Sequence, residues 1–134
     1  MEKNPEEQQE IMFKLSMFER EIRKLQEQLK IVEKEILDLN SLVFSLDGLK
    51  GKKGEEVKAP VGRGIFIEAK LTSEELIVDV GGKRFVKKTI SETQELIKRQ
   101  IKKLEEVKKE LEDNIDLISD ETQKIIEGFS ENRK

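Results

Sequence analysis

Apolar residues recur at alternating intervals of three and four through the first third of this sequence. Eleven successive positions of this pattern are apolar, without an exception. They are Ile11, Leu15, Phe18, Ile22, Leu25, Leu29, Val32, Ile36, Leu39, Val43 and Leu46. This spacing is that of the a and d positions of a coiled coil. Because so narrow an apolar stripe needs a partner, the pattern predicts a helix over residues 6–49 that packs against a second helix.

A second stripe with the same spacing runs through the last third of the chain. Its members are Ile90, Gln94, Ile97, Ile101, Leu104, Lys108, Leu111, Ile115, Ile118, Thr122, Ile125 and Phe129. Ser91 is the expected N-cap, with Gln94 at the capping-box position, so the stripe predicts a helix over residues 91–130. The three polar members fall at a positions, where such residues commonly specify register. Lys108 is expected to extend toward neighbouring glutamates.

The two stripes match in length, and the segment between them returns the chain, so the helices should run antiparallel. If Leu46 faces Gln94, the numbers of facing residues sum to 140, as for Leu29 with Leu111. Each such pair sets an a position opposite a d position, which antiparallel packing requires.

Residues 55–89 have a different pattern, in which short apolar runs alternate with turn residues. Glycines mark turns at residues 62–64 and 81–82, which predicts four short antiparallel strands in two hairpins. The apolar residues expected to mediate oligomerisation through these strands are Val57, Ala59, Val61, Ile65, Phe66, Ile67, Leu71, Leu76, Ile77, Val78, Val80, Phe85 and Val86. Two hairpins without a covering helix are marginal alone and expose edges that pair with other chains. The predicted class is therefore α+β, with residues 1–134 forming one domain.

Composition excludes several functions. The chain has no His and no Cys, which removes the commonest general base and metal ligand and excludes thiol chemistry. The glycine–lysine stretch near residue 51 lacks phosphate-loop spacing, and acidic residues fall at outward helix positions, so we expect no catalytic, cofactor or metal site. A net charge of −3 argues against nucleic acid as a partner. No apolar run approaches a membrane span, and the polar N-terminus is unlike a secretory signal, so the expected location is the cytoplasm.

Apolar residues leave the a/d pattern near the two chain ends. Met12 falls at e, Phe13 at f, Met17 at c and Ile126 at e. Together with their seam neighbours they form the expected binding patch: Ile11, Met12, Phe13, Leu15, Met17, Phe18, Ile125, Ile126 and Phe129. Methionine adapts to irregular partners, and an exposed apolar patch commonly marks an interaction site. The alternative is that another subunit or a second patch covers it. Four other off-seam residues, Leu37, Leu42, Phe44 and Leu96, are expected to pack against the strands.

A long helix, a small strand insert and a returning helix, in this order, resemble the prefoldin family. The resemblance is carried by the loop 51–54, by VKAPVGRGIFIEAKL at residues 57–71 and by LIVDVGGKRFVKKTISE at residues 76–92. Four strands rather than two resemble the alpha class of archaeal type.

The resemblance implies an ATP-independent chaperone that holds unfolded polypeptides at its coiled-coil tips and delivers them to a group II chaperonin. It implies a hexamer of two alpha-class and four beta-class subunits, joined through their strands in a β-barrel body. An alternative is the alpha-like paralogue of some archaea, which assembles by itself into filaments, or a structural coiled-coil scaffold. An enzyme is the least favoured class.

Overall fold

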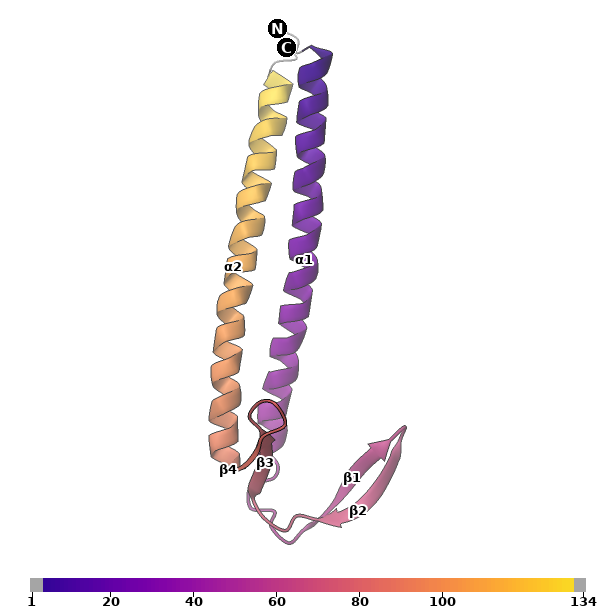
Figure 1. The fold of residues 1–134 in the computed structure, drawn as a ribbon, viewed down its shortest axis with the longest axis vertical. Helices are drawn as coiled ribbons and strands as arrows, with labels where there is room; N and C mark the ends of the chain where they lie inside the picture. The colour runs from indigo at the N-terminus through magenta and orange to yellow at the C-terminus, as the bar shows by residue number, and fades with distance from the viewer. Residues whose placement is uncertain (1–3, 132–134) are drawn as a thin grey trace. The chain divides into compact units, whose positions relative to one another are not determined.

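The structure, a computed structural model, describes residues 4–131 of the chain. Helix α1 (Pro5–Asp47) is followed by strands β1 (Glu56–Gly62), β2 (Ile65–Lys70), β3 (Glu75–Asp79) and β4 (Phe85–Thr89), and then by helix α2 (Ile90–Glu131), as Figure 1 shows. The chain divides into two compact units. The strand unit is residues 36–103, and the terminal unit combines the described residues up to 35 with those from 104 onward.

Burial along α1 and α2 follows the predicted stripes. Every one of the eleven α1 positions from Ile11 to Leu46 is buried or half-buried, and the α1 residues between them are exposed. On α2, all twelve predicted positions from Ile90 to Phe129 are likewise buried or half-buried. Each unit therefore contains a segment of α1 packed along its apolar stripe against a segment of α2, and the predicted pair of helices is confirmed.

The best-buried core lies in the strand unit. Leu46, Ile90, Ile97 and Ile101 form a buried cluster. The partly buried residues packed against it are Ile36, Leu39, Val43, Leu49 and Leu76. Because Leu76 belongs to β3, this cluster attaches the second hairpin to the helices within this unit.

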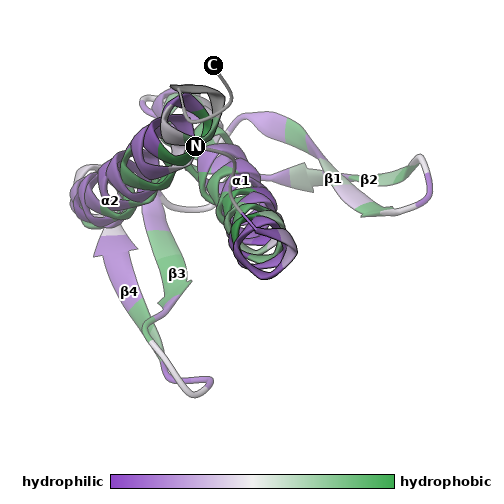
Figure 2. Cartoon of the chain, turned by 90° about the horizontal axis from the view of Figure 1, so that it is seen from above, coloured by the Kyte–Doolittle hydropathy of each residue, from purple (hydrophilic) through white to green (hydrophobic). Residues whose placement is uncertain are grey.

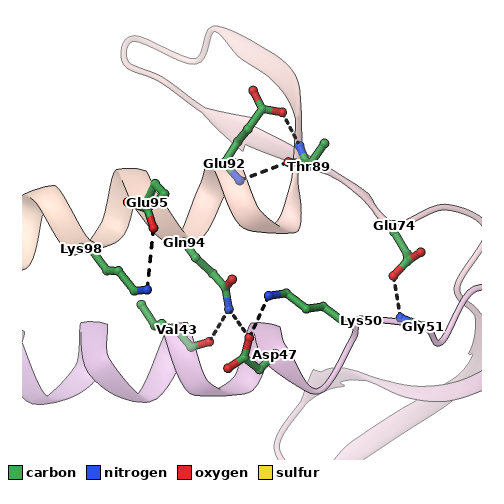
Figure 3. Close-up of polar contacts among 10 residues, drawn as sticks. All are labelled: Val43, Asp47, Lys50, Gly51, Glu74, Thr89, Glu92, Gln94, Glu95 and Lys98. Atoms are coloured by element: carbon green, nitrogen blue, oxygen red, sulfur yellow. Dashed lines mark hydrogen bonds and ion pairs between the residues drawn. The ribbon is translucent and has the colours of Figure 1, made fainter.

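Gln94 fixes the register of the two helices in the strand unit. Its side chain is only 5% exposed. Its Nε2 atom donates to the Val43 carbonyl oxygen at 3.0 Å and to Asp47 Oδ1 at 2.7 Å (Figure 3). These partners bracket Leu46, the residue predicted to face Gln94, whereas a slip of one heptad would move Gln94 about 10 Å along α1. The predicted register is confirmed here.

The other two polar seam residues behave differently from Gln94. Thr122 Oγ1 donates to the Ile118 carbonyl oxygen at 2.8 Å, one turn back in the same helix. Lys108 is half-buried and forms no ion pair among the described residues, so its expected extension toward neighbouring glutamates stays a prediction. Only one of the three polar seam positions therefore connects the two helices.

The N-cap of α2 differs from the sequence prediction. Thr89 Oγ1 accepts the Glu92 N–H at 3.1 Å, and Glu92 Oε1 accepts the Thr89 N–H at 3.1 Å (Figure 3). This reciprocal pair is a capping box, so the cap is Thr89, and Ser91 lies inside the helix. At the start of α1, Asn4 Oδ1 accepts the Glu7 N–H at 2.8 Å, with Pro5 as the first helical residue.

The four strands form two separate two-stranded antiparallel sheets, β1–β2 and β3–β4. The first hairpin turns at Arg63 and Gly64, both with positive φ, which is the backbone that two-residue hairpin turns favour. The second turns through residues 80–84, where Asp79 Oδ1 accepts the Gly81 N–H at 2.8 Å. Both turns fall where the glycine pattern predicts them. Within residues 4–131, neither helix has an apolar stretch long enough to cross a lipid bilayer.

Candidate functional site

The terminal unit exposes large apolar side chains beside its seam. Met12 is 70% exposed, Phe13 69%, Met17 52% and Ile126 44%. The seam residues around them are only half-buried: Ile11, Leu15, Phe18, Ile125 and Phe129. The predicted binding residues on each helix therefore remain accessible, and we call Met12, Phe13, Met17 and Ile126 the terminal patch.

Helix geometry places members of the terminal patch next to one another. Phe13 and Met17 are four residues apart on α1, so their side chains are neighbours on its outward face. Met12 and Ile126 both fall at e positions, which lie on the same side of an antiparallel seam in the predicted register. Lys14 Nζ lies 6.0 Å from the centre of the Phe18 ring, at the limit of a cation–π contact. The patch thus combines flexible thioethers, one aromatic ring and a nearby positive charge.

Exposed apolar residues also occur elsewhere on the helices. Ile31 and Leu117 are exposed at outward positions of the terminal unit, and Leu37, Leu42 and Phe44 are exposed in the strand unit. The expectation that Leu37, Leu42 and Phe44 pack against the strands is wrong, because Phe44 is 79% exposed. Leu37 and Phe44 fall at b positions and Leu42 at a g position, so none of them faces the other helix. The strand residue that packs against the buried cluster is Leu76 of β3, and it does not cover these three. Leu96, the fourth of these residues, is half-buried.

The first hairpin has one wholly apolar face. Because side chains alternate along a strand, and Val57 lies opposite Ala69 and Ala59 opposite Ile67, these four residues share a face. Alternation along β2 adds Ile65, which is exposed. The β1 register shifts between Pro60 and Gly62, so Val61, also exposed, lies at this irregularity and has no partner across the hairpin. Phe66 belongs to the other face, opposite Pro60 and beside the charged residues of the hairpin. Leu71 lies just beyond β2, where its N–H donates to the Glu55 carbonyl oxygen at 3.0 Å.

The second hairpin has an inner and an outer face. Leu76 and Val78 are half-buried and share a face with Val86, which lies opposite Val78. Ile77 and Phe85 lie on the other face and are exposed. Val80 follows β3 and is also exposed. Viewed from above, β3 is largely apolar and much of β4 is hydrophilic (Figure 2). Eight of the thirteen predicted strand residues are therefore exposed in this chain, and the other five are half-buried: Val57, Ala59, Leu71, Leu76 and Val78.

Electrostatics near the start of α2 serve the structure rather than catalysis. The hydrogen bond from Gln94, followed by that from Lys50, lowers the pKa of Asp47 below its ordinary value. The hydrogen bond from the backbone N–H of Thr89 likewise lowers the pKa of Glu92. Lys50 Nζ lies 3.2 Å from Asp47 Oδ1, and Glu74 Oε1 accepts the Gly51 N–H at 2.6 Å, which connects the loop after α1 to the residue before β3 (Figure 3). Each carboxylate has a structural partner.

Sequence reasoning missed these polar contacts in two different ways. The Thr89–Glu92 capping box has a signature in the sequence, T-x-x-E at residues 89–92. This signature would have identified Thr89 as the cap in place of Ser91. The Gln94–Asp47 and Glu74–Gly51 contacts join residues 47 and 23 positions apart, and no local pattern indicates them.

These features define a class of protein: a two-helix coiled-coil subunit with strand surfaces open to assembly and apolar surface open to partners. The sequence profile of the prefoldin subunit family matches residues 18–134. A prefoldin alpha subunit of Methanobrevibacter smithii is 32% identical over 108 residues, which cover 80% of this chain and 69% of that relative. One of Methanococcus aeolicus is 34% identical over 88 residues, or 65% of this chain and 60% of that relative.

A solved structure has the same fold. The filamentous prefoldin of Methanocaldococcus jannaschii, determined by cryo-electron microscopy, matches with a TM-score of 0.75 at 23% identity, over 84% of this chain and 95% of that one. The chain belongs to the prefoldin family, and the resemblance to archaeal alpha subunits is confirmed. Members of this family are chaperones and not enzymes.

Proposed function

We propose that this chain is an ATP-independent holdase subunit that binds unfolded polypeptides at its terminal patch and delivers them to a group II chaperonin. The exposure of Met12, Phe13 and Met17 at the end of the α1 seam is the observation that carries the proposal. Unfolded chains offer apolar side chains in varied arrangements, and methionine accommodates varied shapes. The surrounding seam is half-buried, so a client segment has further apolar surface to cover.

Weak contacts at one patch become effective when several patches bind one client. Assembly through the strands, with beta-class subunits in a hexamer of two alpha and four beta, would place several patches within reach of one flexible chain. The second contact is then intramolecular, and the overall affinity rises by orders of magnitude. The uncovered apolar faces of both hairpins support such assembly.

The experiment replaces Met12, Phe13, Met17 and Ile126 with Ser and measures suppression of aggregation of a chemically denatured client. A control variant replaces with Ser four helix residues that are, as a set, at least as exposed: Ile31, Leu37, Phe44 and Leu117. We expect the patch variant to require a roughly tenfold or higher concentration for the same suppression, because avidity multiplies the loss at each patch. Unchanged suppression by the patch variant, at unchanged assembly mass, would refute the assignment.

A second candidate is a filament-forming, alpha-like paralogue that assembles without beta subunits. The matched Methanocaldococcus jannaschii structure is described as filamentous, and this chain leaves strand edges unpaired among its described residues. Electron microscopy of the purified chain distinguishes the two candidates. Filaments of this chain alone favour the paralogue, whereas closed particles that need a beta-class partner favour the hexamer.

A further inference from the structure

The two units of the chain carry opposite charge. In the terminal unit, residues 4–35 and 104–131 hold 18 acidic and 9 basic residues, whereas residues 36–103 of the strand unit hold 10 acidic and 14 basic ones. The small net charge of the whole chain hides this division. Most of the negative charge comes from the α2 segment 104–131, where ten acidic residues stand against three lysines.

The acidic residues of this α2 segment gather on one face of the helix. Heptad positions e, b and f are adjacent around the helix surface. Between residues 105 and 127 these positions hold seven acidic residues and a single base, Lys109. All seven acidic side chains are exposed. We call them the acidic strip: Glu105, Glu106, Glu112, Asp113, Asp116, Asp120 and Glu127.

The acidic strip begins at the terminal patch. Ile126, the member of the patch on α2, falls at an e position of the same face and directly precedes Glu127. From Ile126 back to Glu105 the face extends for about 30 Å along the helix. An extended polypeptide covers this length with about ten residues. The face therefore offers apolar contact at one end and negative charge along the rest.

The charges of the acidic strip have no cationic partner within the described residues. None of the seven forms an ion pair, and the ion pair of the terminal unit joins Arg23 to Glu19 on α1. Glu127 Oε1 accepts a hydrogen bond from Gln123 Nε2 at 3.1 Å, which is a neutral donor. Like charges on neighbouring turns of a helix repel each other. A positively charged partner would relieve this repulsion.

The same helix face changes sign in the strand unit. Between residues 91 and 102, positions e, b and f hold Lys98, Arg99 and Lys102 against Glu92 and Glu95. Both of these glutamates have partners, since Glu95 Oε1 lies 3.7 Å from Lys98 Nζ and Glu92 belongs to the capping box. Attraction for a cationic partner is therefore a property of the terminal unit and not of α2 as a whole.

We propose that the terminal patch and the acidic strip together select unfolded client segments in which apolar residues are followed by lysine or arginine. The apolar side chains of such a segment cover the patch, and its cations lie along the strip. Segments rich in aspartate or glutamate are repelled. Charge complementarity across an interface discriminates between partners and speeds their association. The inference rests on the proposed client binding and names the chemistry of the preferred client.

Three labelled peptides test this preference. They share one apolar half, and the other half carries lysines, glutamates or serines. Fluorescence anisotropy with the assembled protein gives the dissociation constant of each. We expect the lysine peptide to bind roughly tenfold more tightly than the glutamate peptide at low salt, because several exposed charge pairs each contribute modestly. The difference should shrink in concentrated salt, which screens exposed charges.

Two triple variants locate the preference on the molecule. The strip variant E112Q/D116N/D120N removes three charges from the acidic strip. The control variant E21Q/E27Q/E35Q removes three exposed charges from g and f positions of α1. Both change the net charge equally and leave the terminal patch intact. We expect the strip variant to lower the preference for lysine over glutamate about threefold, and the control to retain most of it.

Equal binding of the lysine and glutamate peptides by the wild type, or an equal loss of preference in the two triple variants, would overturn the proposal. The serine peptide separates this result from the proposed function. The four-serine patch variant should weaken all three peptides by a similar factor, because it removes only apolar contact. Wild-type binding of the serine peptide by that variant would refute client binding at the patch, whereas wild-type preference in the strip variant would refute only the charge selection.

Discussion

The helix segments of the strand unit and those of the terminal unit share one heptad pattern but differ in how well their seams are buried. In the strand unit, Leu46, Ile97 and Ile101 are buried, and Gln94 connects the helices through two hydrogen bonds. In the terminal unit, Leu25 is the buried seam residue among those described, and the others are half-buried. A repeated pattern therefore specifies pairing along the whole length, whereas burial depends on what else packs beside the seam.

The proposed binding surface lies where burial of the seam is weakest. Two helices alone cannot enclose an a/d stripe, and β3 contributes Leu76 to the cluster only in the strand unit. The terminal unit leaves its stripe partly open and adds Met12 and Phe13 outside it. The best-buried core and the proposed binding patch therefore belong to different segments of the same two helices.

The largest expected difference between the two segments is the effect of truncating a seam residue. Ile97→Ala should lower the free energy of unfolding by about 3 kcal/mol, because a buried side chain leaves a cavity. Ile125→Ala should lower it by only about 1 kcal/mol, since its side chain is half-buried and water fills the space. Chemical denaturation of the assembled protein, followed by circular dichroism, measures both values. Equal losses would contradict the comparison.

Helix capping is a smaller effect that sharpens the same comparison. Thr89→Ala should cost about 1 kcal/mol, because it removes half of the capping box at the start of α2. Ser91→Ala is the control and should have little effect, since Ser91 lies inside the helix. Asn4→Ala, at the end of α1 where a helix frays, should cost less than Thr89→Ala. A larger melting-temperature loss for Ser91→Ala than for Thr89→Ala would restore Ser91 as the cap.

The smallest effect is a dependence on pH confined to the strand unit. The pKa of Asp47 is lowered by its hydrogen bond from Gln94, so its charged form stabilises the fold. This stabilisation is complete above the ordinary carboxyl pKa of about 4 and is lost as the pH falls through the lowered value. Asp47→Asn should therefore melt below the wild type at pH 6, and the two melting temperatures should converge toward pH 2. A difference that grows on acidification would contradict this role.

Much of the fold could be predicted from the sequence because its signals are repeated or conformationally strict. The seam from Ile11 to Leu46 repeats one rule, and the hairpin turns need the positive φ of residues such as Gly64 and Gly82. The buried faces of the strands were not predicted. Alternation places Ile77 and Val78 on opposite sides of β3, but which side faces the helices depends on how the hairpin packs.

The candidate site was predicted only as a set of positions. Heptad positions identify Phe13 as outward, and the structure places it so. The same reasoning places Phe44 off the seam, and only the added expectation that it packs against the strands was wrong. Whether a strand covers Phe44 depends on where the hairpins pack, which is a property of tertiary structure. Long-range polar contacts such as Gln94 with Asp47 depend on the register and become visible only in three dimensions.

The most direct measurement of the central claim is photo-cross-linking to an unfolded client. A benzophenone-bearing phenylalanine analogue replaces Phe13 in one variant and Phe44 in another, and each assembled protein is irradiated with a denatured client. Phe44 is the more exposed of the two, at 79% against 69%, so exposure alone would favour position 44. Binding at the terminal patch predicts client adducts from position 13 and few from position 44. Equal or stronger labelling from position 44 would contradict it.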